Sequence, residues 1–491
     1  MNLVVVSNRL PFAIVRDEED GPWRVEPGSG GLVTALRPVL RNRGGRWIGW
    51  AGVTEEQLPD PSAPLTDARK RFGYDLIPVP LTDKERDRFY SGFSNEIIWP
   101  LFHDLVSLCN FDPSYWAIYE AVNQKFADCV ASHVRPDDFV WVHDYHLMRV
   151  AKALGGLPTR PRVAFFLHIP FPPLDIFLKL PWRFEVLNAL LAYDLVGFQT
   201  VRDRRNFVQC IRLLLPDVRV SGRGAVWTLR VGDREVRIGS FPISIDVGEF
   251  ERRAEEDAVV EKAARLQADD PGRKLVLGVD RLDYTKGIPQ KLEAFRNLLR
   301  RFPETREKVT LIQVVVPSRE DIPRYREHKA AVEGLVGEIN GEFTRAGWIP
   351  IRYIHRGLEG SSLAGYYRAA DIALVTPLKD GMNLVCKEYC ASHVDGDGVL
   401  ILSEFAGAAA QLQNGALLVN PYDVEGVANA IHEAMHLPPA GRRSRMRRLR
   451  RALREADIYH WLDTFLEAAI SKDLADFPLV QDYLPASAVA P

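Results

Sequence analysis

Hydrophobic and polar positions follow two alternating patterns along this chain. Short apolar runs, typical of buried strands, are separated by longer segments with the 3.6-residue period of amphipathic helices. Strands are predicted at Leu3–Ser7, Asp138–His143, Val163–Ile169, Leu195–Phe198, Lys274–Val279, Val309–Val316, Ile372–Val375 and Val399–Ser403. Helices are predicted at Ser114–Val134, Arg202–Leu215, Pro289–Arg301 and Tyr325–Thr344. This alternation predicts an α/β fold in which helices cover both faces of parallel sheets.

The strands and helices fall into two series, and 491 residues are many for a single core. Between the series, Val226–Ile238 has the pattern of a hairpin that turns at Gly232-Asp233, and Ser240–Phe250 is suited to a linker. We therefore expect two doubly wound, Rossmann-like domains whose parallel sheets face each other across a cleft. The predicted segments are residues 1–245, residues 246–455, a helical segment 456–480 that returns to the first domain, and a frayed tail, 481–491.

Composition narrows the class of protein. The chain is 46% hydrophobic and 26% charged, with a formal net charge of -2, which argues against a general attraction to nucleic acid or membranes. The N-terminus, MNLVVVSNRLPF, lacks the basic start and apolar stretch of a signal peptide. No apolar run approaches the ~20 residues that span a bilayer. The five scattered cysteines suit a reducing compartment, so we expect a cytoplasmic protein.

The segment Thr376–Ser392, TPLKDGMNLVCKEYCAS, carries the strongest chemical signal. It follows a predicted strand, makes a turn at Asp380-Gly381 and then has helical character. A helix that begins there directs backbone N–H groups and its positive dipole end at the loop, which favours a phosphate or diphosphate. Asp380 is placed to accept hydrogen bonds from sugar hydroxyls, and Glu388, about two turns further on, could bind ribose. The segment suits a nucleotide-sugar, although a helix with an ordinary acidic cap has the same pattern.

Three further groups of residues follow predicted strands: Gly28–Gly31, His143–Leu147 and Arg281–Gly287. Ligands of doubly wound domains bind at the carboxyl ends of the strands, so these groups are expected to converge on the cleft. Arg281 and Lys286 are two cations that could neutralise a diphosphate leaving group. Each group alone could be a surface turn, but their shared position at strand ends favours a binding site.

Other motifs favour structural roles. His432–His436 reads HEAMH, the zinc-protease pattern, but lies beside an apolar stripe that places both histidines on the solvent flank of a helix. Asp395–Asp397 resembles a D-x-D metal site, yet it lies in a glycine-rich turn. Gly28–Gly31 lacks the third glycine of a nicotinamide-binding loop. Arg442–Arg454, with eight arginines, is interpreted as a solvated helix face, an anionic partner being the alternative.

A set of longer strings, in this order, resembles the trehalose-6-phosphate synthases, a retaining glycosyltransferase family with the two-domain GT-B fold. The resemblance covers about residues 1–470. The strings are SNRLP, GSGGL, RWIGWAG, FYSGFSNEIIWPLFH, HDYHL, FFLHIPFP and GFQT in the first half, and RLDYTKG, VVPSRED, INGEF, KDGMNLVCKEY and LSEFAGAA in the second.

The resemblance implies transfer of glucose from a nucleotide diphosphate, UDP-glucose being the expected donor, to C1 of glucose 6-phosphate, without a metal or other cofactor. Acceptor-binding residues would be Arg9, Tyr90, Trp99, Asp144 and Arg319. Donor-binding residues would be Gly31, Trp50, His168, Arg281, Lys286, Asp380, Met382, Asn383, Leu384, Val385 and Glu388. The catalytic set would be Asp380, His168, Arg281 and Lys286.

The expected partners are these two small-molecule substrates, with no nucleic acid and no membrane, and a homo-oligomer is left open. Two arginines and a tyrosine hydroxyl suit a phosphate monoester without a metal. Glycines in HRGLEGSS, after the predicted strand at Ile351–Ile354, leave the donor base (UDP, GDP or ADP) open. The main alternative is a glucosylglycerol-phosphate synthase, which has the same fold and uses glycerol 3-phosphate as acceptor.

Overall fold

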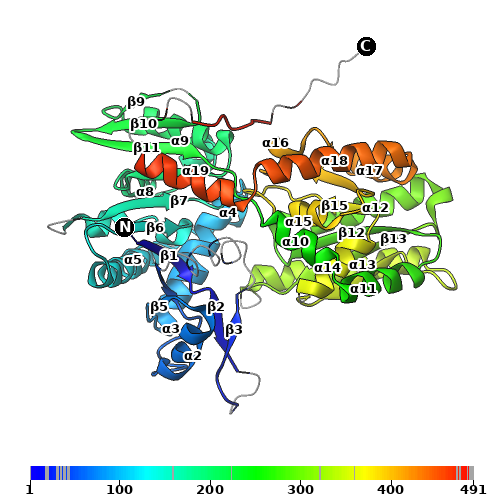
Figure 1. Cartoon of the computed structure of the whole chain (residues 1–491), viewed down its shortest axis with the longest axis horizontal. Coiled ribbons are helices and arrows are strands. Elements are labelled where there is room, and N and C mark those ends of the chain that lie inside the picture. Colours follow the sequence, from blue (N-terminus) through cyan, green and yellow to red (C-terminus); the bar gives the residue numbers. More distant parts are fainter. Residues whose placement is uncertain are drawn as a thin grey trace. The chain divides into compact units, whose positions relative to one another are not determined.

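The structure, a computed structural model, consists of two compact units (Figure 1). Unit 1 contains Met1–Pro242 and Trp461–Val480, and unit 2 contains Ile243–His460 and Gln481–Pro491. The residues described are 2–16, 21–28, 33, 36, 40, 45–156, 160–222, 224–319, 322–358, 360–471, 474, 477–483 and 485. The predicted domain boundaries remain predictions.

Unit 1 is built on a nine-stranded sheet in the order β5-β4-β1-β6-β7-β8-β11-β10-β9. The strands from β5 to β11 are parallel, whereas β10 and β9 continue the sheet antiparallel. The bounds are β1 (Leu3–Arg9), β4 (Gly45–Trp50), β5 (Asp75–Pro78), β6 (Phe139–His143), β7 (Arg162–Phe166), β8 (Leu195–Phe198), β9 (Arg219–Ser221), β10 (Val226–Val231) and β11 (Arg234–Ser240), with a separate hairpin of β2 (Phe12–Val15) and β3 (Arg24–Pro27).

The helices of unit 1 cover this sheet. They are α2 (Ser62–Phe72), α3 (Asp83–Glu85), the π-helix η1 (Arg86–Ile98), α4 (Trp99–Phe102), η2 (Val106–Leu108), α5 (Ser114–His133), η3 (Tyr145–Leu147), α6 (Val150–Ala153), η4 (Leu154–Gly156), α7 (Leu174–Phe177), α8 (Arg183–Leu190), α9 (Val201–Leu214) and, from Trp461 on, α19 (Ile458–Ile470). Although α19 is distant in sequence, it lies across the sheet in Figure 1, and Trp461 stacks on Trp141 of β6 with ring centroids 5.0 Å apart.

Unit 2 has a six-stranded sheet in the order β14-β13-β12-β15-β16-β17, and all its pairs are parallel. Its strands are β12 (Lys274–Arg281), β13 (Val309–Val316), β14 (Ile351–His355), β15 (Ile372–Val375), β16 (Val399–Ser403) and β17 (Leu417–Val419). Its helices are α10 (Val247–Ala254), α11 (Asp257–Ala268), η5 (Tyr284–Lys286), α12 (Ile288–Arg301), η6 (Pro303–Thr305), α13 (Pro323–Phe343), α14 (Gly360–Ala369), α15 (Val385–Ser392), α16 (Ala409–Leu412), α17 (Val424–His436) and α18 (Pro439–Glu455).

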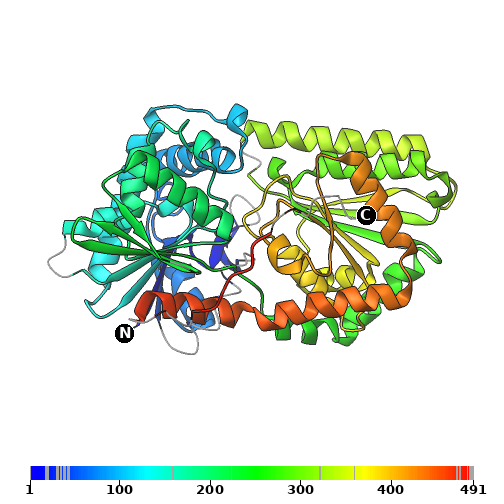
Figure 2. The ribbon, with the colours of Figure 1, turned by 90° about the horizontal axis from the view of Figure 1, so that it is seen from above.

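Helices cover both faces of the unit 2 sheet, as Figure 2 shows for α13 and α18 on opposite sides. On one face, α12 packs against α13 and α17, and on the other α15 packs against α10, α14 and α18. The apolar stripe of α12 shows why this helix forms where it does. Pro289 lies in its first turn, and Leu292, Phe295 and Leu299 are fully buried in the core.

Both sheets have the same topology from the first strand outward. In chain order, unit 2 runs 3-2-1-4-5-6, and the parallel part of unit 1 runs 3-2-1-4-5-6-7. The strand order therefore reverses between β1 and β6 in unit 1 and between β12 and β15 in unit 2. Doubly wound folds bind ligands at this switch point, next to the carboxyl ends of the strands. Both expected doubly wound sheets are thus present.

The structure corrects the start of one predicted helix. Asn383 has a left-handed backbone (φ 76°), so the helix after Asp380-Gly381 begins at Val385 rather than at Met382. Glu388 consequently lies in the first turn of α15, not two turns into it.

The hairpin that turns at Gly232-Asp233 is confirmed as β10 and β11. No helix among the described residues is both long and apolar enough to cross a membrane.

Candidate active site

Arg9 ends β1 at the unit 1 switch point, and its guanidinium lies over two aromatic rings. The Arg9 Cζ atom is 4.1 Å from the ring centroid of Trp50 and 5.6 Å from that of Tyr90. Gly52 (φ 94°) makes room for it, since a Cβ there would lie 2.7 Å from the guanidinium. Arg9 is exposed to solvent, and arginine keeps its positive charge in proteins, as an anion-binding residue requires.

Tyr90 lies on η1 and is held by residues of the HDYHL segment. Its ring stacks on His146 with centroids 5.8 Å apart and an interplanar angle of 10°. The Asn95 side-chain amide donates to the Tyr90 carbonyl at 2.7 Å and accepts from the Tyr145 hydroxyl at 2.8 Å. Trp99 is buried and lies against Tyr145 with ring centroids 5.8 Å apart. Tyr90 and Trp99 are therefore fixed to one aromatic cluster at the end of β6.

Asp144 follows β6 with a backbone conformation, φ 74° and ψ 165°, that non-glycine residues rarely adopt. Its N–H donates to the Phe166 carbonyl, and its Oδ1 accepts from the His168 N–H at 3.2 Å. The His168 ring contacts the buried His143 ring, Nε2 to Nδ1, at 3.1 Å. Burial lowers the pKa of His168 to about 3. The pKa of His143 is also lowered, mainly by burial and to a smaller extent by the nearby His168. Both rings are therefore neutral near pH 7, and the half-buried His168 can exchange hydrogen bonds with a hydroxyl.

At the unit 2 switch point, Lys286 and Asp380 form an ion pair. Lys286 Nζ lies 2.6 Å from Asp380 Oδ2, with 11% and 14% of the two side chains exposed. The Asn383 amide donates to the same carboxylate oxygen at 3.2 Å, and its Oδ1 caps the Cys386 N–H at 3.1 Å. One hydrogen-bonded chain thus connects the β12 loop to the first turn of α15.

The loops of unit 2 approach one another so closely that two glycines are required. Gly287 has φ 65°, and a Cβ there would lie 2.7 Å from the Thr376 carbonyl oxygen. At Gly407 a Cβ would lie 1.9 Å from the Gly381 carbonyl oxygen. Gly407 also donates its N–H to the Asp380 carbonyl at 3.1 Å. These contacts hold the Asp380 loop against two neighbouring strand ends.

The N–H groups at the start of α15 point out of the helix without intrahelical acceptors. Lys387 and Glu388 both donate their N–H groups to the Leu384 carbonyl, so Leu384 and Val385 form the terminus. Glu388 is half-buried and accepts from the Tyr367 hydroxyl at 2.7 Å. Burial raises the pKa of Glu388, while Tyr367 and Arg253 counteract part of that rise. A carboxylate so placed can accept hydrogen bonds from ribose hydroxyls.

Arg281 ends β12, and Arg319 follows β13 with a left-handed backbone (φ 53°). The carboxylate they share, Asp283, was not predicted from the sequence. Arg319 NH1 lies 3.6 Å from Asp283 Oδ2. Burial would raise the pKa of Asp283, but Arg319, Arg281 and Lys286 outweigh it, so the net shift is downward. The signal was present in RLDYTKG, where an acid stands between two predicted cations.

Backbone strain gives an independent sign of these positions. Asp144, Arg319 and Asn383 are three of the five described non-glycine residues with positive φ; the other two are Asp104 and Glu307. Such conformations cost about 1–3 kcal/mol each and concentrate at functional sites.

Trp50 lies among the predicted acceptor residues rather than the predicted donor residues. Gly31 lies outside the described residues.

A sequence model of glycosyltransferase family 20 matches residues 1–471. The chain belongs to glycosyltransferase family 20. A trehalose-6-phosphate synthase of Mycolicibacterium gilvum is 43% identical over 479 residues, which cover 96% of this chain and 94% of that protein.

Solved structures agree with this assignment to family 20. An α,α-trehalose-phosphate synthase (UDP-forming) from Burkholderia xenovorans, in complex with glucose-6-phosphate, aligns with a TM-score of 0.85 at 35% identity, covering 96% of this chain and 100% of that one. A protein from E. coli bound with UDP-2-fluoro glucose aligns with a TM-score of 0.84 at 35% identity, covering 96% and 99%. This family 20 member is therefore a glycosyltransferase with the GT-B fold.

The other sequence motifs of this family 20 protein have structural partners. His432 of the HEAMH segment stacks on Phe302 with ring centroids 4.0 Å apart. Asp397 of the D-x-D segment binds Arg442 through both carboxylate oxygens, at 2.6 and 2.9 Å. Within the described part of the chain, no three His, Cys, Asp or Glu side chains are grouped as ligands of a metal ion would be.

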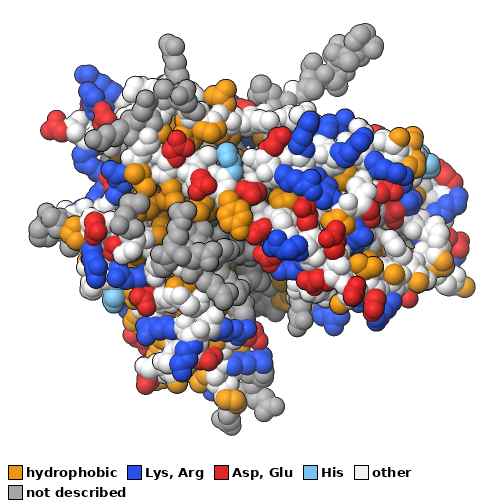
Figure 3. Space-filling model, viewed as in Figure 1, with side chains coloured by type: hydrophobic (Ala, Val, Ile, Leu, Met, Phe, Trp, Pro, Cys, Tyr) orange, Lys and Arg blue, Asp and Glu red, His pale blue; other side chains and the backbone are white. Residues whose placement is uncertain are grey.

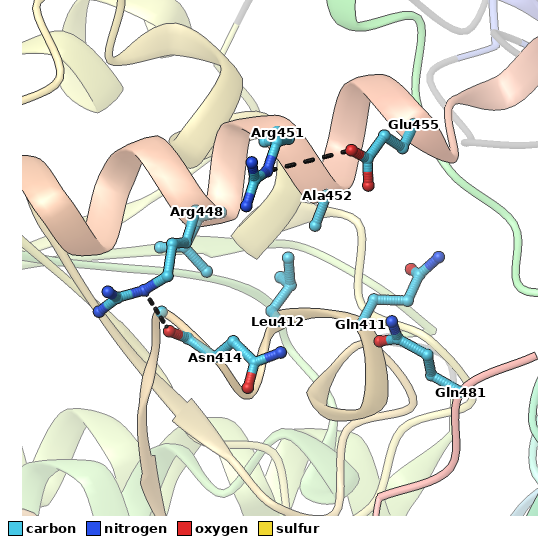
Figure 4. Close-up of a pocket in the computed structure, with 10 residues that line it drawn as sticks. Gln411, Leu412, Asn414, Arg448, Arg451, Ala452, Glu455 and Gln481 are labelled. Atoms are coloured by element: carbon cyan, nitrogen blue, oxygen red, sulfur yellow. Dashed lines mark hydrogen bonds and ion pairs between the residues drawn. The ribbon is translucent and has the colours of Figure 1, made fainter.

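The basic side chains visible over α18 in Figure 3 are largely engaged with unit 2 itself. Arg450 and Arg454 both bind Glu251, and Arg448 donates to the Asn414 carbonyl at 2.6 Å. A cavity of about 480 Å³ lies beside this helix (Figure 4). Its lining contains none of the predicted site residues, and its exposed Arg451 pairs with Glu455 at 4.0 Å. The contacts here favour the structural interpretation of the arginine-rich segment.

Proposed function

We propose that this chain is a trehalose-6-phosphate synthase that transfers glucose from UDP-glucose to glucose 6-phosphate with retention of configuration and without a metal. The observation that carries the proposal is the Lys286–Asp380 pair at the unit 2 switch point, next to the first turn of α15. A cation and a helix N-terminus suit a diphosphate, and a carboxylate beside them suits sugar hydroxyls.

The relatives support both substrates. One solved structure is in complex with glucose-6-phosphate and another is bound with UDP-2-fluoro glucose. For this chain, we assign the acceptor phosphate to Arg9, Tyr90 and Arg319, and the acceptor sugar to Trp99 and Asp144. Arg9 is exposed and charged, and Arg319 has a left-handed backbone conformation of the kind found at functional sites. Both observations are consistent with that assignment.

We assign the donor diphosphate to Arg281, Lys286 and the backbone from Met382 to Val385. As the glycosidic bond to the diphosphate breaks, negative charge develops on the leaving oxygen, and these groups would stabilise it. His168 and Asp380 would hold hydroxyls of the transferred glucose. Because His168 is neutral, it can hydrogen-bond a hydroxyl without placing a second positive charge beside the developing oxocarbenium ion.

The leaving phosphate would take the proton from the attacking hydroxyl on the same face of the sugar, which gives retention. In this mechanism the protein positions the two substrates and stabilises the developing charge, and no covalent intermediate forms. It also explains why the site is rich in arginine and lysine, which neutralise the phosphates directly.

The decisive experiment is a matrix of donors against acceptors. UDP-, GDP- and ADP-glucose are each incubated with glucose 6-phosphate and with glycerol 3-phosphate, with and without EDTA, and products are identified by mass. We expect a phosphorylated disaccharide from UDP-glucose and glucose 6-phosphate, unaffected by EDTA. NMR coupling constants at both anomeric carbons then report the configuration.

A product formed only from glycerol 3-phosphate would instead support a glucosylglycerol-phosphate synthase. The relatives named above are trehalose-phosphate synthases and do not favour that alternative. Loss of synthesis with EDTA would contradict the metal-independent chemistry, and an inverted anomeric centre would contradict retention.

A further inference from the structure

Asp283 is fully buried at the centre of the unit 2 site, and its two carboxylate oxygens have different partners. Oδ1 accepts from the Thr285 N–H at 2.9 Å and from the Thr285 hydroxyl at 2.8 Å. Oδ2 accepts from the Tyr325 hydroxyl at 3.3 Å and pairs with Arg319 at 3.6 Å. The two oxygens therefore hold two different parts of the site.

The Oδ1 side fixes the short turn η5, which carries Lys286. Thr285 is anchored at both ends, because its own carbonyl accepts from the Leu378 N–H at 2.8 Å. The next residue, Lys286, reaches Asp380 from this turn. The position of the lysine proposed for the donor diphosphate thus depends on how Asp283 Oδ1 holds Thr285.

The Oδ2 side fixes Arg319, the arginine proposed for the acceptor phosphate. Arg319 NH1 donates to the Tyr325 hydroxyl at 2.7 Å, and the same hydroxyl donates to Asp283. Only 7% of the Arg319 side chain is exposed, and Tyr325 packs on Tyr284 with ring centroids 5.2 Å apart. The guanidinium is therefore held from its buried side, which leaves less conformational entropy to lose when an anion binds.

A buried carboxylate can also be a purely structural part of a core, and β12 contains such a case. Asp280 forms a fully buried ion pair with Lys291 and accepts from the Gln313 amide at 2.9 Å. None of these partners is a proposed substrate-binding residue. Asp280 and Asp283 are thus matched in burial and chain position but differ in what they hold.

We propose that Asp283 is a positioning residue that serves both substrates, placing the Lys286 turn with one oxygen and Arg319 with the other. This inference rests on the proposed function, since it takes Lys286 as a donor residue and Arg319 as an acceptor residue. It predicts that the two roles can be separated by changing one oxygen at a time.

Asp283→Asn makes that separation. The Thr285 N–H requires an acceptor, so the amide oxygen occupies the Oδ1 position and the amide NH₂ group faces Tyr325 and Arg319. We expect the KM for glucose 6-phosphate to rise about tenfold or more, the usual effect of losing a hydrogen bond to a charged group. The KM for UDP-glucose should change by less than about threefold. Asp283→Ala removes both supports and should also lower kcat.

A double mutant tests whether Asp283 acts through Arg319. We expect Asp283→Asn to add less than about twofold to the acceptor KM of Arg319→Ala, because coupled residues are not additive. Full additivity would overturn the proposal. Asp280→Asn is the matched control, which should lower stability but leave the ratio of the two KM values unchanged.

Tyr325→Phe provides a second variant should Asp283→Asn fail to fold. It keeps the ring and removes only the hydroxyl that joins Arg319 to Asp283, so the acceptor KM should rise about fivefold with the donor KM unchanged. An unchanged acceptor KM in Tyr325→Phe, or equal effects on both substrates in Asp283→Asn, would overturn the proposal. Absence of product from the unaltered protein would instead refute the proposed function, and the two failures are therefore distinguishable.

Discussion

The two units use one topology for two kinds of chemistry. In both sheets the strand order reverses beside the first strand, and predicted site residues end or follow the strands on either side: Arg9 and Asp144 in unit 1, Arg281 and Asp380 in unit 2. Unit 1 has neutral histidines, stacked aromatic rings and one exposed arginine there, whereas unit 2 has a buried network of ion pairs. The fold therefore determines where a ligand can bind, and the side chains at the strand ends determine which one.

The difference suits two unlike tasks. A sugar ring needs hydrogen bonds and an apolar face, which aromatic and neutral polar groups supply. A diphosphate that becomes a leaving group needs fixed positive charge in a partly buried site, where electrostatic interactions are stronger than in water.

Lys286→Ala should be the most damaging change at the unit 2 switch point. It removes a cation proposed to stabilise the leaving diphosphate and leaves Asp380 without this partner, so kcat should fall about 10²- to 10³-fold. Steady-state rates with both substrates saturating would show this. Lys274→Ala is the control, since Lys274 lies at the opposite end of β12 and pairs with Asp371. Comparable losses in both variants would contradict a specific role of Lys286.

Arg319→Ala should weaken acceptor use by about 10- to 150-fold, as expected for a lost hydrogen bond to a charged group. The KM for UDP-glucose should hardly change, because the Lys286 turn keeps its support from Asp283 Oδ1. Titrating each substrate while the other is saturating separates the two effects. Equal increases in the KM values for glucose 6-phosphate and UDP-glucose would refute the acceptor assignment of Arg319.

Lys387→Met should change the pH dependence of stability above pH 7. Burial lowers the pKa of Lys387 to about 7, while the unfolded chain keeps its usual value near 10.4. Between these values the unfolded state binds more protons, so stability rises with pH by up to about 1.4 kcal/mol per unit. Urea unfolding at pH 7, 8 and 9 should show a flatter slope in the variant. An unchanged slope would show that Lys387 does not titrate in this range.

His168→Gln should change the pH dependence of stability below pH 6.5. The effect should be smaller than that of Lys387→Met, because His168 is only half-buried. The pKa of His168 is about 3 in the folded protein and near 6.5 when unfolded, so stability is lost as pH falls below 6.5. The slope should be less than about 1.4 kcal/mol per pH unit. Unfolding at pH 5, 6 and 7 should be less pH-dependent in the variant. A reduced slope above pH 7 instead would contradict this separation of the two units.

Much of the fold was predictable because it follows from local patterns. Val309–Val316, Ile372–Val375 and Val399–Ser403 are strands with the predicted bounds, since fully buried parallel strands are continuous apolar runs. The start of α15 was not predictable in this way, because Asn383 adopts a left-handed conformation that its loop contacts support. The helix η1, which carries Tyr90, was not predicted as an element, and its i→i+5 hydrogen bonds do not follow the usual helical period.

The sequence by itself determined the α/β class, the two strand–helix series and the family, because periodicity and motif strings are properties of neighbouring residues. Only the tertiary structure decided that Arg319, from the end of another strand, pairs with Asp283, and that His168 is neutral. The physical reason is that these properties depend on charge and burial contributed by strands far apart in the chain. Such long-range proximity is set by the order of strands in the sheet, which local patterns do not encode.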